Sequence, residues 1–260
     1  MSAKLTPGGP EGNRIPRSPQ ATEASSRGLR LSPWVGLVLA LVAGAIAWLL
    51  VQRYHPVFRV AKEYENFGVG APQEKLDALR VAQDKVDLHN ALLEFGVLGV
   101  LVGAVFALGE AVARRSVRAA IVALVAAVLL GGLGGLAAGA VGNTAHRPFG
   151  KRGVPAELSD TVKVQVFTLA TLGMGVGLAI GVSTLSLRTA VVSALAGLLV
   201  GVLAGFLYPV VLFSFWPTTP SDSLIPAGRA DRLLWIGLFV ALLGLLVPAV
   251  ARQPPAARKR

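Results

Sequence analysis

The sequence predicts an all-α protein: a polytopic membrane helix bundle with six transmembrane helices. Of its 260 residues, 53% are hydrophobic and only 15% are charged, against about 25% charged in an ordinary soluble domain. Six stretches are each apolar for about 20 residues, the length that a helix needs to cross a hydrocarbon core of roughly 30 Å. We expect these spans at about 33–52, 90–112, 117–142, 162–183, 187–212 and 232–251.

The segment before the first span is a polar tail. Residues 1–32 are rich in Pro, Gly, Ser and Arg and carry too few apolar groups to offset the entropy of ordering, so we expect a disordered cytoplasmic tail. A signal peptide is an alternative for the first apolar run, because residues 43–47 are small. The run continues through Val51, however, and exceeds the usual apolar region of about 7 to 15 residues. An uncleaved signal anchor is therefore the expected form.

A charged segment at about 72–89 leads into the second span. Its apolar residues Leu76, Leu79 and Val86 have the spacing of an amphipathic helix, which we place on the extracytoplasmic side. Neither Pro nor Gly separates this segment from the second span, so one helix is expected to run from about 72 to 114. The segment either binds a partner or lipid headgroups, or it is a solvated cap on the bundle.

Two pairs of spans match one another in sequence. The stretch RAAIVALVAAVLLGGLGG, which begins at Arg118, aligns with RTAVVSALAGLLVGVLAG, which begins at Arg188. The second and fourth spans align at a slightly larger offset, which pairs Gly99 with Gly173. The sequence thus predicts a tandem repeat of a two-helix hairpin at the centre of the chain.

Glycines recur at four-residue intervals in four spans. The run 132–137 also fits the phosphate-binding pattern G-x-G-x-x-G/A, but that pattern needs a preceding strand and a tight turn, and this run lies inside an apolar stretch. Glycines four apart share one face of a helix and let a neighbouring helix approach closely. We therefore predict helix packing through Gly99, Gly103, Gly131, Gly135, Gly139, Gly173, Gly177, Gly181, Gly197, Gly201 and Gly205.

The positions of the basic residues predict the orientation. The tail before the first span, the connection containing Arg114, Arg115 and Arg118, and the basic C-terminal tail at 253–260 fall on one side of a six-span bundle. Short cytoplasmic loops carry an excess of Lys and Arg, so both termini are expected in the cytoplasm. The opposite loops hold nearly as many basic residues, together with most of the acids. The expected location is the plasma membrane, which is the inner membrane if the source is bacterial.

A group of ionisable residues lies at the predicted outer ends of the helices. His55, His89 and His146 fall at the ends of three helices, near Asp87 and near Glu94, which stands about one turn inside the second span. Imidazole and carboxylate together suit Zn²⁺ and similar ions, and ionisable groups in a span often mark proton or ion pathways. The group forms a possible ion or proton site, or each histidine lies alone at the membrane interface.

Other classes of function find little support in the sequence. The net charge of +11 could suggest nucleic acid, but the basic residues lie between and beyond the apolar runs instead of along one face. The chain has no cysteine, which excludes disulfides and thiolate chemistry, and no motif predicts an enzyme or a cofactor. The expected partners are the lipid bilayer, other membrane proteins or further copies of the chain. Two hypotheses remain: a structural or accessory membrane subunit, and a carrier or channel for a small solute or cation.

Overall fold

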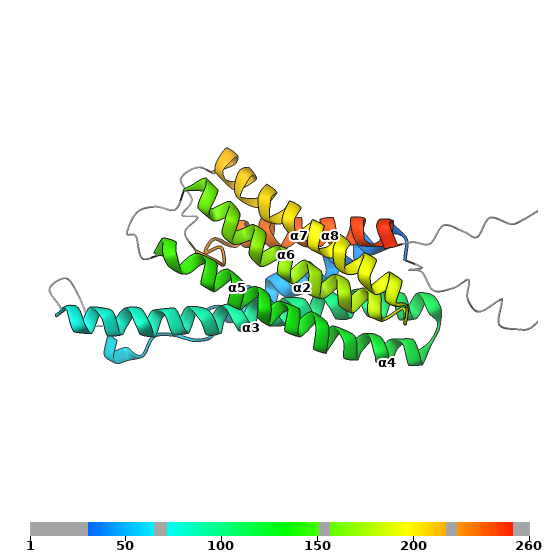
Figure 1. Ribbon diagram of the computed structural model, residues 1–260, viewed down its shortest axis with the longest axis horizontal. Coiled ribbons are helices and arrows are strands. Elements are labelled where there is room, and N and C mark those ends of the chain that lie inside the picture. Colours follow the sequence, from blue (N-terminus) through cyan, green and yellow to red (C-terminus); the bar gives the residue numbers. More distant parts are fainter. Residues whose placement is uncertain (1–30, 65–71, 151–156, 217–222, 252–260) are drawn as a thin grey trace, which may run out of the picture.

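The computed structural model describes residues 31–64, 72–150, 157–216 and 223–251, and all the regular structure within these ranges is helical (Figure 1). The predicted tails at 1–32 and 253–260 therefore lie outside the described residues, apart from Leu31 and Ser32. The elements are α2 (Pro33–Tyr54), η2 (Lys62–Tyr64), α3 (Gln73–Arg114), α4 (Val117–Ala126), η3 (Ala127–Gly131), α5 (Gly132–Gly150), α6 (Leu158–Val182), α7 (Leu187–Phe215) and α8 (Arg229–Ala251).

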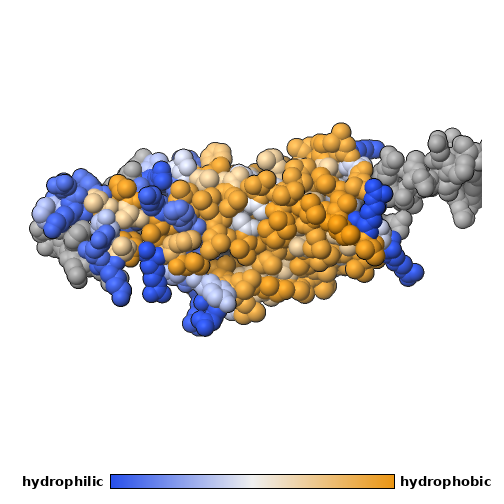
Figure 2. Space-filling model, turned by 90° about the horizontal axis from the view of Figure 1, so that it is seen from below, coloured by the Kyte–Doolittle hydropathy of each residue, from blue (hydrophilic) through white to orange (hydrophobic). Residues whose placement is uncertain are grey.

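Six of the described helices are long and apolar enough to cross a membrane, and this confirms the predicted all-helical class and the number of candidate spans. α4, η3 and α5 together supply one of the six, over Ala120–Pro148. On the face shown in Figure 2, a wide hydrophobic band covers the middle of the bundle, with hydrophilic residues gathered towards both ends. This distribution is compatible with a multi-pass membrane protein.

The two ends of the bundle differ in their connections. The α3–α4 and α6–α7 turns are short and lie at one end (Figure 1), which we call the turn end. Residues 55–64 and 223–228 lie at the other end, which we call the loop end. α3 is one continuous helix of 42 residues, about 63 Å long at 1.5 Å per residue. Its N-terminal part therefore extends beyond the other helices at the loop end (Figure 1).

Serine side chains begin two of the helices. The hydroxyl of Ser32 accepts a hydrogen bond from the backbone N–H of Val35 at 3.2 Å, and Pro33 follows at the first helical position of α2. The hydroxyl of Ser186 accepts a hydrogen bond from Thr189 N–H at the start of α7. Such caps satisfy backbone donors that have no partner within the helix, and Pro is well suited to the first position because it has no N–H to lose.

The glycines of the first hairpin lie against the backbone of the opposite helix. A Cβ atom added at Gly99 on α3 would overlap the carbonyl of Gly131 in η3, and one at Gly135 on α5 would overlap the carbonyl of Phe95. Gly139 meets Ala91 in the same way. Gly103 differs, because an added Cβ would lie 3.5 Å from Ala127, which is ordinary contact. Three of these glycines thus permit backbone-to-backbone contact, whereas Gly103 has room for a methyl group.

The second hairpin packs in a related way. A Cβ atom added at Gly173 on α6 would overlap the carbonyl of Gly197 on α7, and one at Gly201 would overlap that of Leu169. Gly99 lies against Gly131 in the first hairpin, and the sequence alignments pair Gly99 with Gly173 and Gly131 with Gly201. If both alignments held, Gly173 would lie against Gly201 in the second hairpin. Gly173 instead lies one turn away, so the packing does not follow the register implied by that alignment.

The turns of the two hairpins support one common offset for both helices, the offset that aligns Arg118 with Arg188. Arg115 in the first turn and Leu185 in the second are the non-glycine residues of the described chain with positive φ, at 52° and 55°. Arg115 follows α3 directly, and its N–H donates to the carbonyls near the end of that helix. Helices commonly end at a residue with the left-handed backbone conformation. In both hairpins the residue with positive φ lies three residues before the aligned arginine.

Further contacts join the hairpins to each other and to the outer helices. Gly134 on α5 lies against Gly175 on α6, and Gly36 on α2 lies against Gly244 on α8. The ring of Phe95 packs edge-to-face on Trp235 of α8, with centroids 5.4 Å apart. α2, the first helix of the described chain, thus packs against α8, the last.

Candidate functional site

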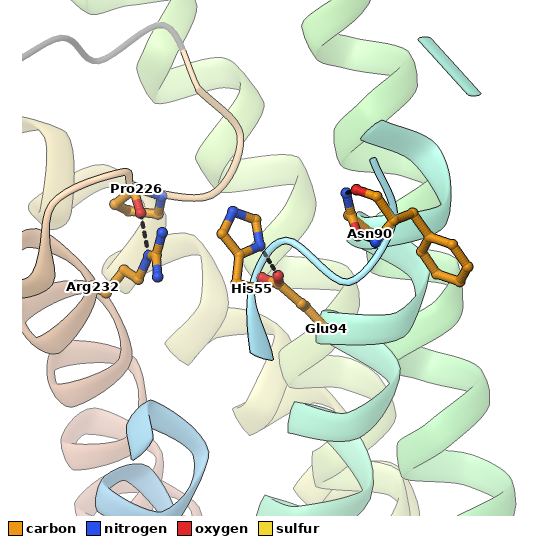
Figure 3. Close-up of polar contacts among 6 residues, drawn as sticks. His55, Asn90, Glu94, Pro226 and Arg232 are labelled. Atoms are coloured by element: carbon orange, nitrogen blue, oxygen red, sulfur yellow. Dashed lines mark hydrogen bonds and ion pairs between the residues drawn. The ribbon is translucent and has the colours of Figure 1, made fainter. Parts of the chain in front are cut away.

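The loop end brings His55 and Glu94 together. The backbone N–H of His55 donates to Val51 and ends α2, while its Nδ1 contacts Oε1 of Glu94 on α3 (Figure 3). The Glu94 side chain is 10% exposed, and its other oxygen, Oε2, is buried with no hydrogen-bond partner in the described part of the chain. Of the predicted site residues, these two form a direct side-chain contact.

Asn90 holds the loop after α2 against α3. Its Oδ1 accepts a hydrogen bond from the N–H of Phe58 at 2.9 Å, and its Nδ2 donates to the carbonyl of Phe58 at 3.0 Å (Figure 3). The Phe58 ring lies 5.4 Å from the ring of His89. Because Asn90 is buried and satisfies both polar backbone groups of one residue, it fixes the path of the loop across α3.

A cavity of about 570 Å³, which we call the loop-end cavity, lies beside this loop. Three predicted site residues line it: His55, Asp87 and His146. Glu94 lines a separate cavity of about 300 Å³ between α2 and α3, on which His55 also borders, and His89 lines neither. The other residues that line the loop-end cavity are Pro56, Phe58, Arg59, Val60, Val86, Asn90, Ala91, Asn143, Ser223, Leu224 and Ile225.

Among the described residues that line this cavity, Asp87 is the one with an acidic side chain. Partial burial raises the pKa of its carboxyl group, and the neighbouring Asp84 raises the pKa further. The positive charges that His146 and His55 acquire on protonation lower it in part. Desolvation is the largest of these effects, so Asp87 takes up a proton more readily than an exposed aspartate.

The described residues do not form a metal centre. Nowhere in the described ranges do three or more His, Cys, Asp or Glu side chains lie close enough to hold a metal ion. Of the two alternatives for these residues, a metal site formed by three or more of them therefore finds no support among the described residues. Instead, the structure forms one imidazole–carboxylate pair beside a cavity.

The segment 223–228, which precedes α8, contributes Ser223, Leu224 and Ile225 to the wall of the cavity. The carbonyl of Leu224 accepts a hydrogen bond from Nε2 of Gln165 at 3.1 Å, and the indole N–H of Trp235 donates to Oε1 of Gln165 at 2.9 Å. Nε of Arg232 donates to the carbonyl of Pro226 at 2.5 Å (Figure 3). These buried bonds fix the segment on the ends of α6 and α8.

The polar side chains of α6 make hydrogen bonds within the bundle. Gln165 bonds across helices as described above, whereas the hydroxyls of Thr168 and Thr171 donate to the carbonyls of Val164 and Phe167 in their own helix. Such bonding to the carbonyl four residues back is common for Thr within a helix.

Two residues that line the cavity, Arg59 and Asn143, were not among the predicted ion-site residues. Arg59 lies on the loop after α2, where no pattern in the sequence indicates which helix the loop will contact. Asn143 stands three residues before His146 on α5, so the two share a helix face. That spacing was a usable signal for Asn143, whereas Arg59 offered none.

No protein-family model, curated protein or solved structure matches the chain. The geometry of the bundle and of its loop end is therefore the basis for any statement about function.

Proposed function

We propose that the chain is a multi-pass integral membrane protein that acts as a structural or accessory subunit, without enzymatic activity. The hydrophobic band in Figure 2, which is flanked by hydrophilic residues, supports its insertion in a bilayer. Arg115, Arg118 and Arg188 lie in or just after the short turns. Their position supports a cytoplasmic turn end, and six spans then place both termini in the cytoplasm.

The observation that carries the subunit proposal is the use of the glycine faces. Gly99, Gly135, Gly173 and Gly201 meet the backbone of helices within their own chain, so they hold the bundle together instead of forming a surface for self-association. The outward face of α7 carries exposed leucines at four-residue intervals, namely Leu195, Leu199 and Leu203. A smooth aliphatic stripe of this kind suits lipid tails or the helix of another subunit.

The two hairpins also support a duplicated unit as the core of the bundle. Their turns contain residues of the same unusual conformation, Arg115 and Leu185, and Arg118 and Arg188 follow at matching positions. Duplication gives a rigid scaffold in which both copies use glycine for close approach, which suits a packing role as well as a transporter built from parallel repeats.

Membrane insertion and orientation can be tested with single cysteines, because the natural chain has none. Val117→Cys and Leu187→Cys place thiols at exposed positions at the turn end, and Lys85→Cys places one on the projecting part of α3. An impermeant maleimide added outside intact cells should label only Lys85→Cys. Labelling of all three would contradict insertion, and labelling of only the two turn-end cysteines would reverse the orientation.

The subunit role can be tested by mild-detergent purification of the chain from its native membrane. We expect a stoichiometric membrane-protein partner that is lost when Leu199→Lys interrupts the outward stripe of α7. Gly237→Ala serves as the control because no atom lies near an added Cβ. Recovery of the wild-type chain alone, across detergents that preserve its fold, would contradict the subunit proposal.

One observation favours a second candidate, a carrier or channel for a small solute or cation. His55 lines the loop-end cavity together with Asp87 and His146, and it also contacts Glu94, which borders the neighbouring cavity. Ionisable residues grouped within a helix bundle recur along ion and solute pathways. Uptake into proteoliposomes should then require Glu94 and be reduced in Glu94→Gln, but not in Glu74→Gln, which changes an exposed acid on the same helix. Equal uptake by all three proteins would contradict transport through this site.

A further inference from the structure

We propose that the loop-end cavity binds a ligand through an oxyanion, either a carboxylate or a phosphate group. This inference goes beyond the packing role, and it holds whether or not the ligand crosses the membrane. It rests on one buried donor, one unpaired cation and the size of the cavity.

The buried donor is the side chain of Asn143, which lines the cavity. Asn143 is 4% exposed, and its Nδ2 has no hydrogen-bond partner in the described part of the chain. A buried donor that lacks an acceptor costs free energy, and native structures rarely leave one without a reason. An acceptor oxygen supplied by a ligand would satisfy this amide.

The unpaired cation is Arg59. It lines the same cavity, and no acid of the described ranges lies within ion-pair distance of its guanidinium. Asp87, the acid of the cavity, interacts instead with His146 and His55. A guanidinium presents parallel N–H donors that match both carboxylate and phosphate oxygens. The cavity thus offers a free positive charge and a free amide donor to an anion.

The cavity also accommodates more than a bare anion. Its volume of about 570 Å³ lies within the usual range for small-molecule sites, roughly 300 to 1,000 Å³. Ala91, Leu224 and Ile225 provide apolar wall, which suits a short hydrocarbon part. We therefore expect an anion of an organic acid in preference to an inorganic ion.

A second source of the same chemistry is a phospholipid. The cavity of about 300 Å³ on the other side of His55 is lined mainly by apolar residues of α2 and α3, among them Leu50, Val97 and Leu98. A headgroup phosphate at Arg59 and Asn143 would leave an acyl chain free to follow this groove. The shared group is the oxyanion, and the experiment separates the two sources.

The test uses the full-length protein in nanodiscs of phosphatidylcholine, with calorimetric titration of sodium butyrate and sodium sulfate against sodium chloride at constant ionic strength. Phosphatidylglycerol is added to a second set of discs, and retained lipid is counted by native mass spectrometry. Saturable butyrate or sulfate binding assigns a free ligand. Selective retention of phosphatidylglycerol assigns a lipid headgroup. Absence of both would overturn the proposal.

Four variants test the residues. Arg59→Gln and Asn143→Leu should each weaken binding by about tenfold or more, the loss expected for a hydrogen bond to a charged group. Asp87→Asn should strengthen anion binding, because it removes a repelling charge, whereas the same change would weaken binding at a cation site. Arg188→Gln, at the turn end, is the matched control and should bind like the wild type.

The outcomes are decisive even if Asn143→Leu fails to fold, because Arg59 is exposed on a loop and its replacement leaves the packing intact. Wild-type binding by Arg59→Gln would overturn the proposal. Weaker binding by Asp87→Asn, with the fold retained by circular dichroism, would also overturn it.

Discussion

The carboxylate of Glu110 on α3 accepts a hydrogen bond from the backbone N–H of Leu31, 79 residues earlier in the chain, at 3.2 Å. Its other oxygen accepts from Nε of Arg114 at 2.8 Å. Glu110 is 1% exposed, so this buried carboxylate ties the segment before α2 to the turn end of α3. The sequence predicts the pairing with Arg114 from the four-residue spacing, but not the contact with Leu31.

Replacing Glu110 should loosen this connection. Glu110→Gln keeps the shape of the side chain but loses the charge, and we expect destabilisation by about 1.5 to 3 kcal/mol, the range for a hydrogen bond to a charged group. Thermal unfolding in detergent measures the effect, and Glu74→Gln on the projecting part of α3 is the control. An unchanged unfolding temperature would show that the ion pair contributes nothing net.

The effect of a glycine-to-alanine change on the stability of the protein should depend on the space around that glycine. Gly135→Ala drives a methyl group into the carbonyl of Phe95, and such overpacking costs typically about 1 to 3 kcal/mol. Gly103→Ala should be tolerated because its nearest contact is 3.5 Å. Gly237→Ala, with nothing within 4 Å, should stabilise its helix by up to about 1 kcal/mol.

These three variants are measured together by unfolding in one detergent. If all three variants changed the stability equally, the helices would not be packed as closely as they are in the structure. A change in oligomeric state for Gly135→Ala, with the monomer fold retained, would instead assign that glycine to self-association.

Asn90→Leu should release the loop after α2. The variant removes both hydrogen bonds to Phe58, and because Phe58 is exposed its backbone groups can bind water instead, so the expected cost is about 0.5 to 1.5 kcal/mol per hydrogen bond. Hydrogen exchange at Phe58 should become faster while exchange within α6 stays slow. Unchanged exchange at Phe58 would show that the loop is held by other contacts.

Asp87 should make the stability of the folded protein depend on pH. Its pKa in the folded chain is raised above the ordinary value of 3.8, chiefly by desolvation. Between the ordinary value and the raised value the folded state binds more protons than the unfolded state, so stability falls as the pH rises. His146, His55 and Asp84 face the carboxylate and set the position of this window.

Asp87→Asn should remove that pH dependence and stabilise the protein above the window. Unfolding as a function of pH measures this, with Asp77→Asn, on the exposed part of α3, as the control. Binding of sulfate, whose charge stays constant over the window, should weaken as Asp87 loses its proton. A wild-type stability that rises with pH through the window would contradict the assigned shift.

The sequence predicts the helices well because hydrophobic length is a local property. Each span can be located from its own residues, and the absence of Pro and Gly between 73 and 95 predicts that α3 continues beyond the span. Spacing likewise identifies the glycines that share a face, but it does not say which helix they meet. The alignment of Gly99 with Gly173 was one turn out of register with the packing because several glycines four apart align almost equally well.

The site depends on loops, and the sequence therefore predicts it less well. His55 and His146 could be placed at one end of the bundle because they follow predicted spans, and Asp87 because it lies just before the second span. The cavity between them also requires the loop that carries Arg59 and the segment that carries Leu224, and their positions follow from tertiary hydrogen bonds by Asn90 and Gln165. His89 lies near the others in sequence, yet it packs on Phe58.

The contact between Gly36 and Gly244 also bears on how the chain is assembled during synthesis. α2 leaves the ribosome before the other described helices, and α8 leaves after them. Each central hairpin can close as soon as its second helix is made, but the face of α2 that carries Gly36 must wait for α8. Until α8 has been made, the face of α2 that carries Gly36 lacks its partner, so the described bundle cannot be completed before its last helix is present.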